Sequence, residues 1–236
     1  MKQSVLLICV FLVLTGASLA QGLSPKSAEL SLSVGDQSFS SKPFTVGAPQ
    51  SATPIKGSMD LSSGKMYEAR INFYSRKKIG SEVLYGYQYG GVTFNRNTLP
   101  ASSFSVPLQV HTITLDVLYY PFGEMKSGWK PFVTFGGGAI IFRPSSGGQR
   151  AARDPLQGNF DTFFESSRGT GMVGGGVKKA ITKSIGFRAD ASAWVTKVPT
   201  FGLPESSAQV SATVLPVGGV VRNVRASAGI IFYLGK

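Results

Sequence analysis

The feature that most limits what this chain can fold into is an alternation of apolar and polar residues with a period of two, repeated along most of its length. Successive side chains of a β-strand point to opposite faces, so each such run predicts a strand with one apolar face. Clusters of Gly, Pro, Ser and Asn separate the runs, as turns and loops require. Eight strands are predicted, over residues 28–36, 64–76, 80–95, 108–122, 130–143, 168–181, 184–198 and 222–235.

The connections between these strands alternate in length. Three are short (77–79, 123–129 and 182–183) and four are long (37–63, 96–107, 144–167 and 199–221). Up-and-down barrels of outer membranes sort their connections in this way, with short periplasmic turns and long extracellular loops. The sequence therefore predicts an all-β fold, an eight-stranded antiparallel transmembrane β-barrel. Within the last long connection, residues 207–221 either add a ninth strand or extend the final hairpin above the membrane.

The two faces of the predicted strands indicate which medium surrounds the barrel. In the strand 64–76, Tyr67, Ala69 and Ile71 share one face, while Glu68 and Arg70 share the other. Charges in the middle of strands, opposite long apolar faces, are typical of a barrel whose outside meets lipid. Only 15% of the residues are charged, against about 25% in soluble domains. The alternative is a secreted, soluble, lipocalin-like barrel that binds a hydrophobic ligand.

The first 20 residues have the features of a secretory signal peptide. Lys2 is followed by an apolar run from Val5 to Leu14, which at about ten residues is too short to cross a bilayer as a helix. The single Cys lies in this leader, which excludes a disulfide framework in the mature chain. We therefore expect a signal peptide over 1–20, export by the Sec pathway, and one outer-membrane barrel domain over 21–236.

The leader, the eight alternating segments, the four long loops and the apolar-aromatic final strand from Ala226 to Leu234 resemble the small outer-membrane β-barrel proteins. This group includes the barrel of outer membrane protein A and the opacity-type surface proteins. The resemblance covers the whole mature chain. It implies an integral protein of the outer membrane of a Gram-negative-type bacterium, with a structural or surface-adhesion role.

The same resemblance implies partners. The barrel assembly machinery would insert the chain, and the loops at 37–63, 96–107, 144–167 and 199–221 could meet an extracellular ligand. Members of the group usually end on an aromatic residue that this machinery reads, whereas this chain continues to Gly235 and Lys236. Phe232 or Tyr233 is therefore expected to serve as that aromatic.

Charged residues on the inward face predict a polar barrel interior. An eight-stranded barrel is just wide enough for its side chains to fill it, and charges there must pair or stay hydrated. Three acids and three bases are expected to form a structural network in a closed lumen that is not a pore: Glu68, Arg70, Asp116, Arg188, Asp190 and Arg225.

The formal net charge of +12 is concentrated at the predicted short turns. We expect a basic periplasmic rim there, made of Arg76, Lys77, Lys78, Lys126, Lys130, Lys178, Lys179 and Lys183, and Lys236 lies at the same end. For an exported barrel, anionic phospholipid and lipopolysaccharide are nearer partners than nucleic acid.

No motif in the sequence predicts a catalytic, cofactor or metal site. Residues 169–174 match G-x-G-x-x-G, but no helix is predicted after them, as a nucleotide site requires. His111 is the only imidazole, and the residue two positions along on its face is Ile113. A lipid A-modifying enzyme would place a Ser near such a His, so the sequence favours a non-enzymatic protein, with that enzyme class as the rival.

Overall fold

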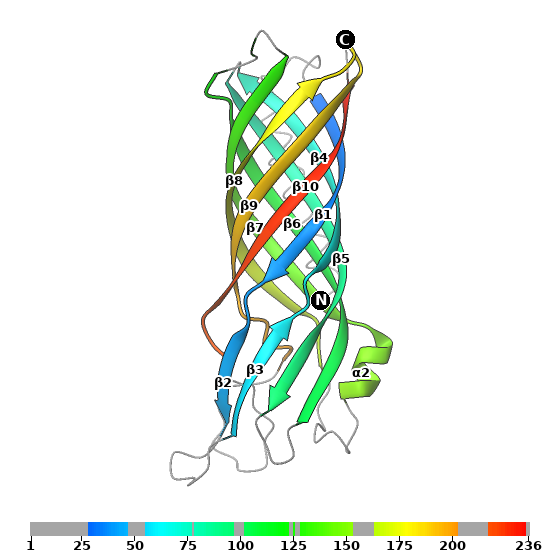
Figure 1. Cartoon of the computed structure of the whole chain (residues 1–236), viewed down its shortest axis with the longest axis vertical. Coiled ribbons are helices and arrows are strands. Elements are labelled where there is room, and N and C mark those ends of the chain that lie inside the picture. Colours follow the sequence, from blue (N-terminus) through cyan, green and yellow to red (C-terminus); the bar gives the residue numbers. More distant parts are fainter. Residues whose placement is uncertain are drawn as a thin grey trace.

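A computed structural model describes residues 28–46, 55–76, 78–96, 102–122, 125, 128–152, 163–202 and 217–234. Eight long strands wind around a common axis (Figure 1). They are β1 (Ala28–Phe39), β4 (Gly64–Arg76), β5 (Ile79–Arg96), β6 (Ser102–Tyr119), β7 (Trp129–Pro144), β8 (Ser166–Ala180), β9 (Ile185–Lys197) and β10 (Val220–Leu234). All eight predicted strands are present, and the predicted fold class is confirmed.

Antiparallel pairing closes these strands into a barrel. The order is β5, β4, β1, β10, β9, β8, β7, β6, and β6 pairs back onto β5. The first and last strands meet along their whole length, from Ala28 opposite Leu234 to Phe39 opposite Asn223. Closure leaves no free strand edge in the barrel wall, which matters because an unpaired edge cannot face hydrocarbon.

One end of the barrel continues as a smaller sheet that the sequence did not predict. The connection 37–63, expected to be a loop, contains β2 (Lys42–Val46) and β3 (Ile55–Leu61). β2 pairs with β3, and β3 pairs with the far end of β5, whose partner on its other side is β6. These four strands form what we call the outer sheet, at the bottom of Figure 1.

The two ends of the barrel differ in their connections. At the top of Figure 1 the strands are joined by the short segments 77–78, 120–128 and 181–184, and we call this the short-turn end. The opposite, long-loop end carries the outer sheet and α2 (Ser146–Ala152). The expectation of a long loop at 96–107 is wrong, because β5 runs to Arg96 and β6 begins at Ser102. Of the segment 207–221, residues 207–216 lie outside the described residues and β10 begins at Val220.

The exterior of the barrel is apolar. Large hydrophobic side chains on all eight strands are exposed there, among them Leu32, Val34, Tyr67, Ile71, Tyr85, Val117, Val133, Phe135, Val173, Ile185, Val195, Val224, Ile230 and Phe232. Among the described side chains, charges on this surface occur only at its two ends, such as Lys65 and Arg143 at one and Lys179 at the other. Separately, no helix in the described part of the chain is long and apolar enough to cross a membrane.

Glycines on β7 let neighbouring strands approach each other. A Cβ on Gly138 would lie 2.0 Å from the carbonyl oxygen of Ile113, and one on Gly136 would lie 2.1 Å from the Asp116 carboxylate. Both glycines face β6, and any side chain would push the two strands apart.

Candidate functional site

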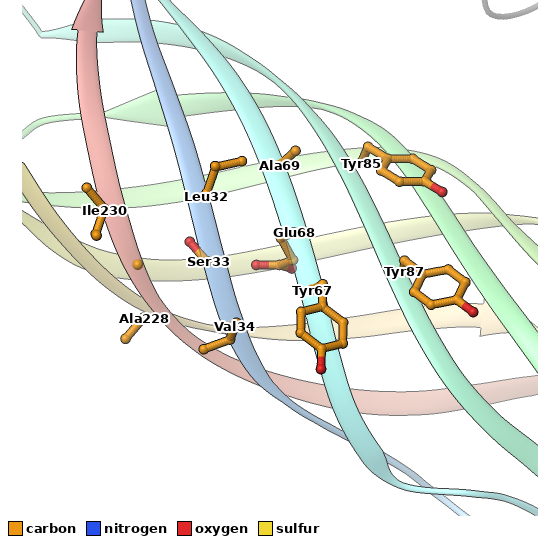
Figure 2. A pocket seen from close by; sticks show the side chains of 11 residues that line it. Leu32, Ser33, Val34, Tyr67, Glu68, Ala69, Tyr85, Tyr87, Ala228 and Ile230 are labelled. Atoms are coloured by element: carbon orange, nitrogen blue, oxygen red, sulfur yellow. The ribbon is translucent and has the colours of Figure 1, made fainter.

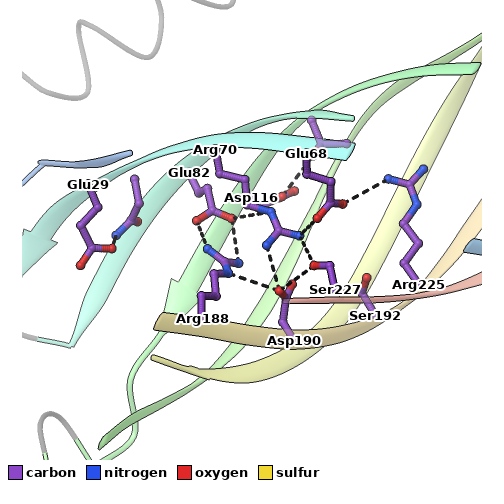
Figure 3. Close-up of polar contacts among 12 residues, drawn as sticks. Glu29, Glu68, Arg70, Glu82, Asp116, Arg188, Asp190, Ser192, Arg225 and Ser227 are labelled. Atoms are coloured by element: carbon purple, nitrogen blue, oxygen red, sulfur yellow. Dashed lines mark hydrogen bonds and ion pairs between the residues drawn. The ribbon is translucent and has the colours of Figure 1, made fainter. Parts of the chain in front are cut away.

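The structure places all six predicted lumen charges inside the barrel, where each is buried. They come from β4, β6, β9 and β10, and the side chains converge on the axis (Figure 3). Each lies at an inward position of its strand, opposite the apolar residues that face outward. The placement therefore follows from the parity of the strands.

Two arginines hold three carboxylates at the centre of this network. Arg70 donates to Asp190 at 2.9 Å and also pairs with Glu68. Arg188 donates through both terminal nitrogens to Glu82, at 3.0 Å for Nη2, and its Nε lies 3.3 Å from Asp190. Glu82 also lies 3.8 Å from Arg70, so the three strands that carry these groups, β4, β5 and β9, are cross-linked through shared partners (Figure 3).

A second group of polar side chains lies in the bore toward the short-turn end. Lys178 donates to the carboxylate of Glu29 and, at 3.0 Å, to the hydroxyl of Tyr120. Glu29 also accepts hydrogen bonds from Tyr74 and from Asn72. Next to this group, the ammonium of Lys130 lies 3.8 Å from the ring centre of Tyr74 and 4.2 Å from that of Tyr120.

Two members of the predicted network have few polar partners. Arg225 stacks on Trp194, 3.9 Å from the ring centre, and donates to Thr112 at 2.8 Å. Its nearest carboxylate, that of Glu68, is 3.9 Å away. Asp116 accepts a hydrogen bond from Thr114 at 3.0 Å and makes no ion pair within the described residues.

Three charged members of the interior were not among the predicted lumen residues: Glu29, Glu82 and Lys178. The sequence assigned Lys178 to the basic rim, which is wrong, because its side chain is only 2% exposed and points into the bore. Lys178 and Lys179 are adjacent in β8, so they must point to opposite faces. Applying strand parity to the ends of each run, as well as to its middle, would have found Lys178 and Glu82.

The remaining predicted rim residues divide between exposed, half-buried and undescribed positions. Lys78 and Lys183 are exposed at the short-turn end, and Lys179 lies 4.9 Å from the ring centre of Trp129. Lys130 is half-buried at the mouth of the bore. The Arg76 side chain, Lys77, Lys126 and Lys236 lie outside the described residues.

The long-loop end holds an apolar core that the sequence did not predict. Its members are Met59, Leu61, Val92, Phe94, Val106, Leu108, Val110, Ile140, Phe142, Phe163, Val198, Phe201, Val217 and Val221. The ring centroid of Phe163 lies 5.6 Å from that of Phe94 and 5.3 Å from that of Phe201. Ten members lie in strands, and Phe163, Val198, Phe201 and Val217 lie in the connections. Outward positions of β5 and β6 near this end, such as Thr93 and Gln109, are polar, so the two faces of these strands exchange character beyond the apolar exterior.

Next to this core, one carboxylate ties the outer sheet together. Asp60 of β3 accepts hydrogen bonds from Ser58 at 2.8 Å and from Asn95 of β5 at 2.7 Å. Burial by itself raises the pKa of Asp60, but hydrogen bonds from Ser41, Ser58 and Asn95 outweigh it and hold the pKa below its usual value. The ionised carboxylate is therefore the form that stabilises this sheet.

His111 and the G-x-G-x-x-G run at residues 169–174 both lie in the barrel wall. His111 faces outward on β6, its Nδ1 2.9 Å from the hydroxyl of Tyr85 and its ring 5.3 Å from that of Tyr87. Residues 169–174 lie within β8, with no helix start. No cluster of three or more metal-ligating side chains occurs among the residues that the structure describes.

Comparison with known proteins identifies the fold. No family model matches the chain, and no curated protein matches it. The crystal structure of outer membrane protein OprG from Pseudomonas aeruginosa matches with a TM-score of 0.52 and 15% identity, over 92% of this chain and 99% of OprG. Neisserial surface protein A matches with a TM-score of 0.49 and 15% identity, over 88% and 97% of the two chains. The chain has the fold of the small outer-membrane β-barrels, as the sequence predicts.

Proposed function

We propose that this chain is an integral outer-membrane protein. Outside the cell it presents a rigid surface that is supported by an apolar core. The observation that carries the proposal is the barrel exterior, where the described side chains of the eight barrel strands are uncharged between the two ends. Soluble monomers rarely expose a contiguous apolar surface of more than a few hundred Å². A hydrocarbon environment removes the cost of that exposure and suits strands of about ten residues.

We propose further that the barrel is closed to ions and does not act as a pore. The ion pairs centred on Arg70 and Arg188 cross its middle, and the Lys178 group and Lys130 lie toward the short-turn end. At the opposite end the apolar core fills the mouth. A hydrated ion entering from either side would have to displace packed side chains.

The proposed role at the cell surface is structural or adhesive, without catalysis. The outer sheet, α2 and the core beneath them give the long-loop end a defined shape that can meet another surface. His111 forms no acyl-transfer relay in this arrangement, since its Nδ1 lies 2.9 Å from a tyrosine hydroxyl and its Nε2 has no hydrogen-bond partner among the described residues. Tyrosine offers no general acid–base relay of the Ser-His-Asp kind.

At the short-turn end we propose the partner that the sequence predicts, anionic phospholipid. Lys78, Lys179 and Lys183 would meet anionic phospholipid headgroups on the periplasmic side. Export by Sec through the leader 1–20 and insertion by the barrel assembly machinery complete the proposed route to the membrane.

The test is outer-membrane fractionation combined with gel mobility of boiled and unboiled samples, followed by conductance in planar bilayers. We expect the protein in the outer-membrane fraction, a faster band before boiling, and no conductance above the lipid baseline. Release by carbonate without detergent would overturn the membrane assignment in favour of a soluble barrel. Reproducible open channels from the purified protein would overturn the closed lumen.

A further inference from the structure

The apolar exterior is not smooth. A groove of about 500 Å³ runs across β10, β1, β4 and β5 (Figure 2). Small residues, Ala69 and Ala228, lie in it, and Gly229 adds no side chain. The larger apolar side chains around it are Leu32, Val34, Tyr67, Tyr85, Tyr87 and Ile230, and Ser33 and Glu68 also line it (Figure 2). A mainly apolar hollow of this volume can hold a saturated hydrocarbon chain.

Charged groups begin where the groove ends. Lys65 and Asp36 lie two residues beyond Tyr67 and Val34 on the same outward faces, and they form an ion pair of 2.9 Å that is highly exposed. By strand rise, Lys65 is about 13 Å along β4 from Ala69. An acyl chain of about ten carbons would cover that distance, so one lipid could place its chain in the groove and its headgroup at Lys65.

Two further cations lie nearer the long-loop end, where Arg222 of β10 lies opposite Ser40, four residues beyond the Asp36 that pairs with Lys65. Arg222 on β10 and Lys197 on β9 are exposed, outward-facing and diagonal neighbours, since Arg222 pairs with Val195 and Lys197 with Val220. Neither side chain has a carboxylate partner within the described residues. Val224 and Ala226 continue the apolar surface from the groove up to Arg222.

We propose that this surface binds one molecule of lipid A, with an acyl chain in the groove and its phosphates at Lys65 and at the Arg222–Lys197 pair. The proposal rests on the outer-membrane location proposed above. Lys65 on β4 and Arg222 on β10 are two strand spacings apart, about 10 Å, and four residues apart along the strands, about 13 Å, so their backbones are separated by about 16 Å. Lipid A carries a phosphate at each end of a disaccharide and so offers two separated anions, whereas a glycerophospholipid offers one phosphate beside its chains.

The long-loop end is also the correct leaflet. Outer-membrane barrels have their long connections outside the cell, where lipid A forms the membrane surface. Exposed ion pairs such as Lys65–Asp36 contribute about 0–1 kcal/mol. Lys65 can therefore exchange its partner for a phosphate at little loss.

The experiment measures lipid retained by the purified protein in native mass spectrometry, after reconstitution in phosphatidylcholine nanodiscs that contain either lipid A or phosphatidylglycerol. We compare the wild type with a groove-filling variant, Ala69→Phe with Ala228→Phe, and with a cation variant, Lys65→Gln with Arg222→Gln. Matched controls are Ala191→Phe, outward on β9 away from the groove, and Lys183→Gln at the other end. Gel mobility before boiling confirms that each variant is folded.

We expect the wild type to retain one lipid A in preference to phosphatidylglycerol. Each cation removed should lower retention about fivefold, the equivalent of about 1 kcal/mol. The groove-filling variant should lose the bound molecule, and both controls should keep it. Equal retention by all variants, or equal retention of the two lipids, would overturn the proposal. Because the assay uses reconstituted protein, its failure is distinct from a failure of the fractionation experiment.

Discussion

At the scale of single residues, the barrel interior depends on charges that have few alternatives to their present partners. Arg188 illustrates this, because its guanidinium is almost completely buried and divides its hydrogen bonds between Glu82 and Asp190. Neither carboxylate can turn to bulk water. A buried ion pair of this kind adds modest net stability, yet the loss of one member is severe because the other charge stays behind.

We therefore predict that Arg188→Met destabilises the folded barrel by about 3–5 kcal/mol. Glu82 would keep only the contact with Arg70 at 3.8 Å. Urea titration followed by the loss of the fast-migrating gel band measures the change. The double variant Arg188→Met with Glu82→Leu should recover most of the stability, since it removes both charges. A double variant as unstable as the sum of the singles would contradict the pairing.

The lumen charges show which features of the site can be predicted from the sequence. Parity identified Glu68, Arg70, Arg188 and Asp190 as inward, because each sits mid-strand among apolar neighbours. Which acid meets which base depends on register and side-chain length, and neither is visible in a pattern of period two. Trp194 beneath Arg225 is likewise a consequence of which strands become neighbours.

At the scale of the strands, β9 presents two faces that experience different media. Ala191 and Val195 both face outward, and Val195 lies near the end of the apolar exterior, two residues before Lys197. If the exterior meets lipid, the free energy of placing a charge there must depend on depth. If it meets water, depth is irrelevant.

We predict that Ala191→Arg costs about 2–4 kcal/mol and that Val195→Arg costs about 0–1 kcal/mol. Both variants carry the same new side chain on the same face, four residues apart, which makes each the control of the other. Unfolding from lipid vesicles gives the two free energies. Equal values would show that no depth-dependent hydrocarbon surrounds β9.

The strands β2 and β3 of the outer sheet are elements that the sequence pattern does not predict. β2 and β3 are short, and β3 pairs with β5 over only five residues, from Gly57 to Leu61. Their stability comes from the core beneath them and from the Asp60 hydrogen bonds, both of which join residues distant in sequence. The period-two alternation is therefore too short in β2 and β3 to predict them, whereas it repeats many times along each barrel strand.

Acid should loosen this sheet. The pKa of Asp60 is lower in the folded chain than its usual value, so the carboxylate contributes stability above about pH 4, its unfolded range, and loses it as the pH falls through the folded pKa. The protection factors of the β3 amides in hydrogen exchange, which correct for the intrinsic pH dependence of the rate, should fall below that range. In Asp60→Asn these protection factors should not change with pH. Unchanged β3 exchange in the wild type down to pH 2 would contradict the assignment.

At the scale of the whole molecule, the chain has two interiors of opposite chemistry in one continuous wall. The barrel section has a polar interior and an apolar exterior, while the long-loop end has an apolar core. A polar interior with an apolar exterior suits a hydrocarbon environment, and an apolar core suits water. The sequence indicated the first, since the long segments carry it, but not the second, since Phe163, Phe201 and Val217 come from connections.

The apolar core at the long-loop end and the polar interior of the barrel should unfold separately. Phe201→Ala removes a ring that is fully buried in the apolar core, a change that costs about 3–5 kcal/mol in such cores. We predict that limited proteolysis then cleaves at the long-loop end while the fast-migrating gel band persists. Phe135→Ala, on the apolar exterior, serves as the control and should leave protease resistance unchanged. If Phe201→Ala lost its protease resistance and its fast-migrating gel band together, the core and the barrel would be one cooperative unit.

The unbroken length of β5 and β6 has a mechanical consequence. Each runs for 18 residues from the short-turn end into the outer sheet, and their ladder holds from Ile79 opposite Tyr119 to Arg96 opposite Ser102. A force that pulls β5 outward relative to β6 loads this ladder in shear, so that many hydrogen bonds share the force. β3 is held to β5 over only five residues, so fewer hydrogen bonds share the force there. Under tension the outer sheet is therefore expected to open at β2 and β3 before the β5–β6 ladder yields.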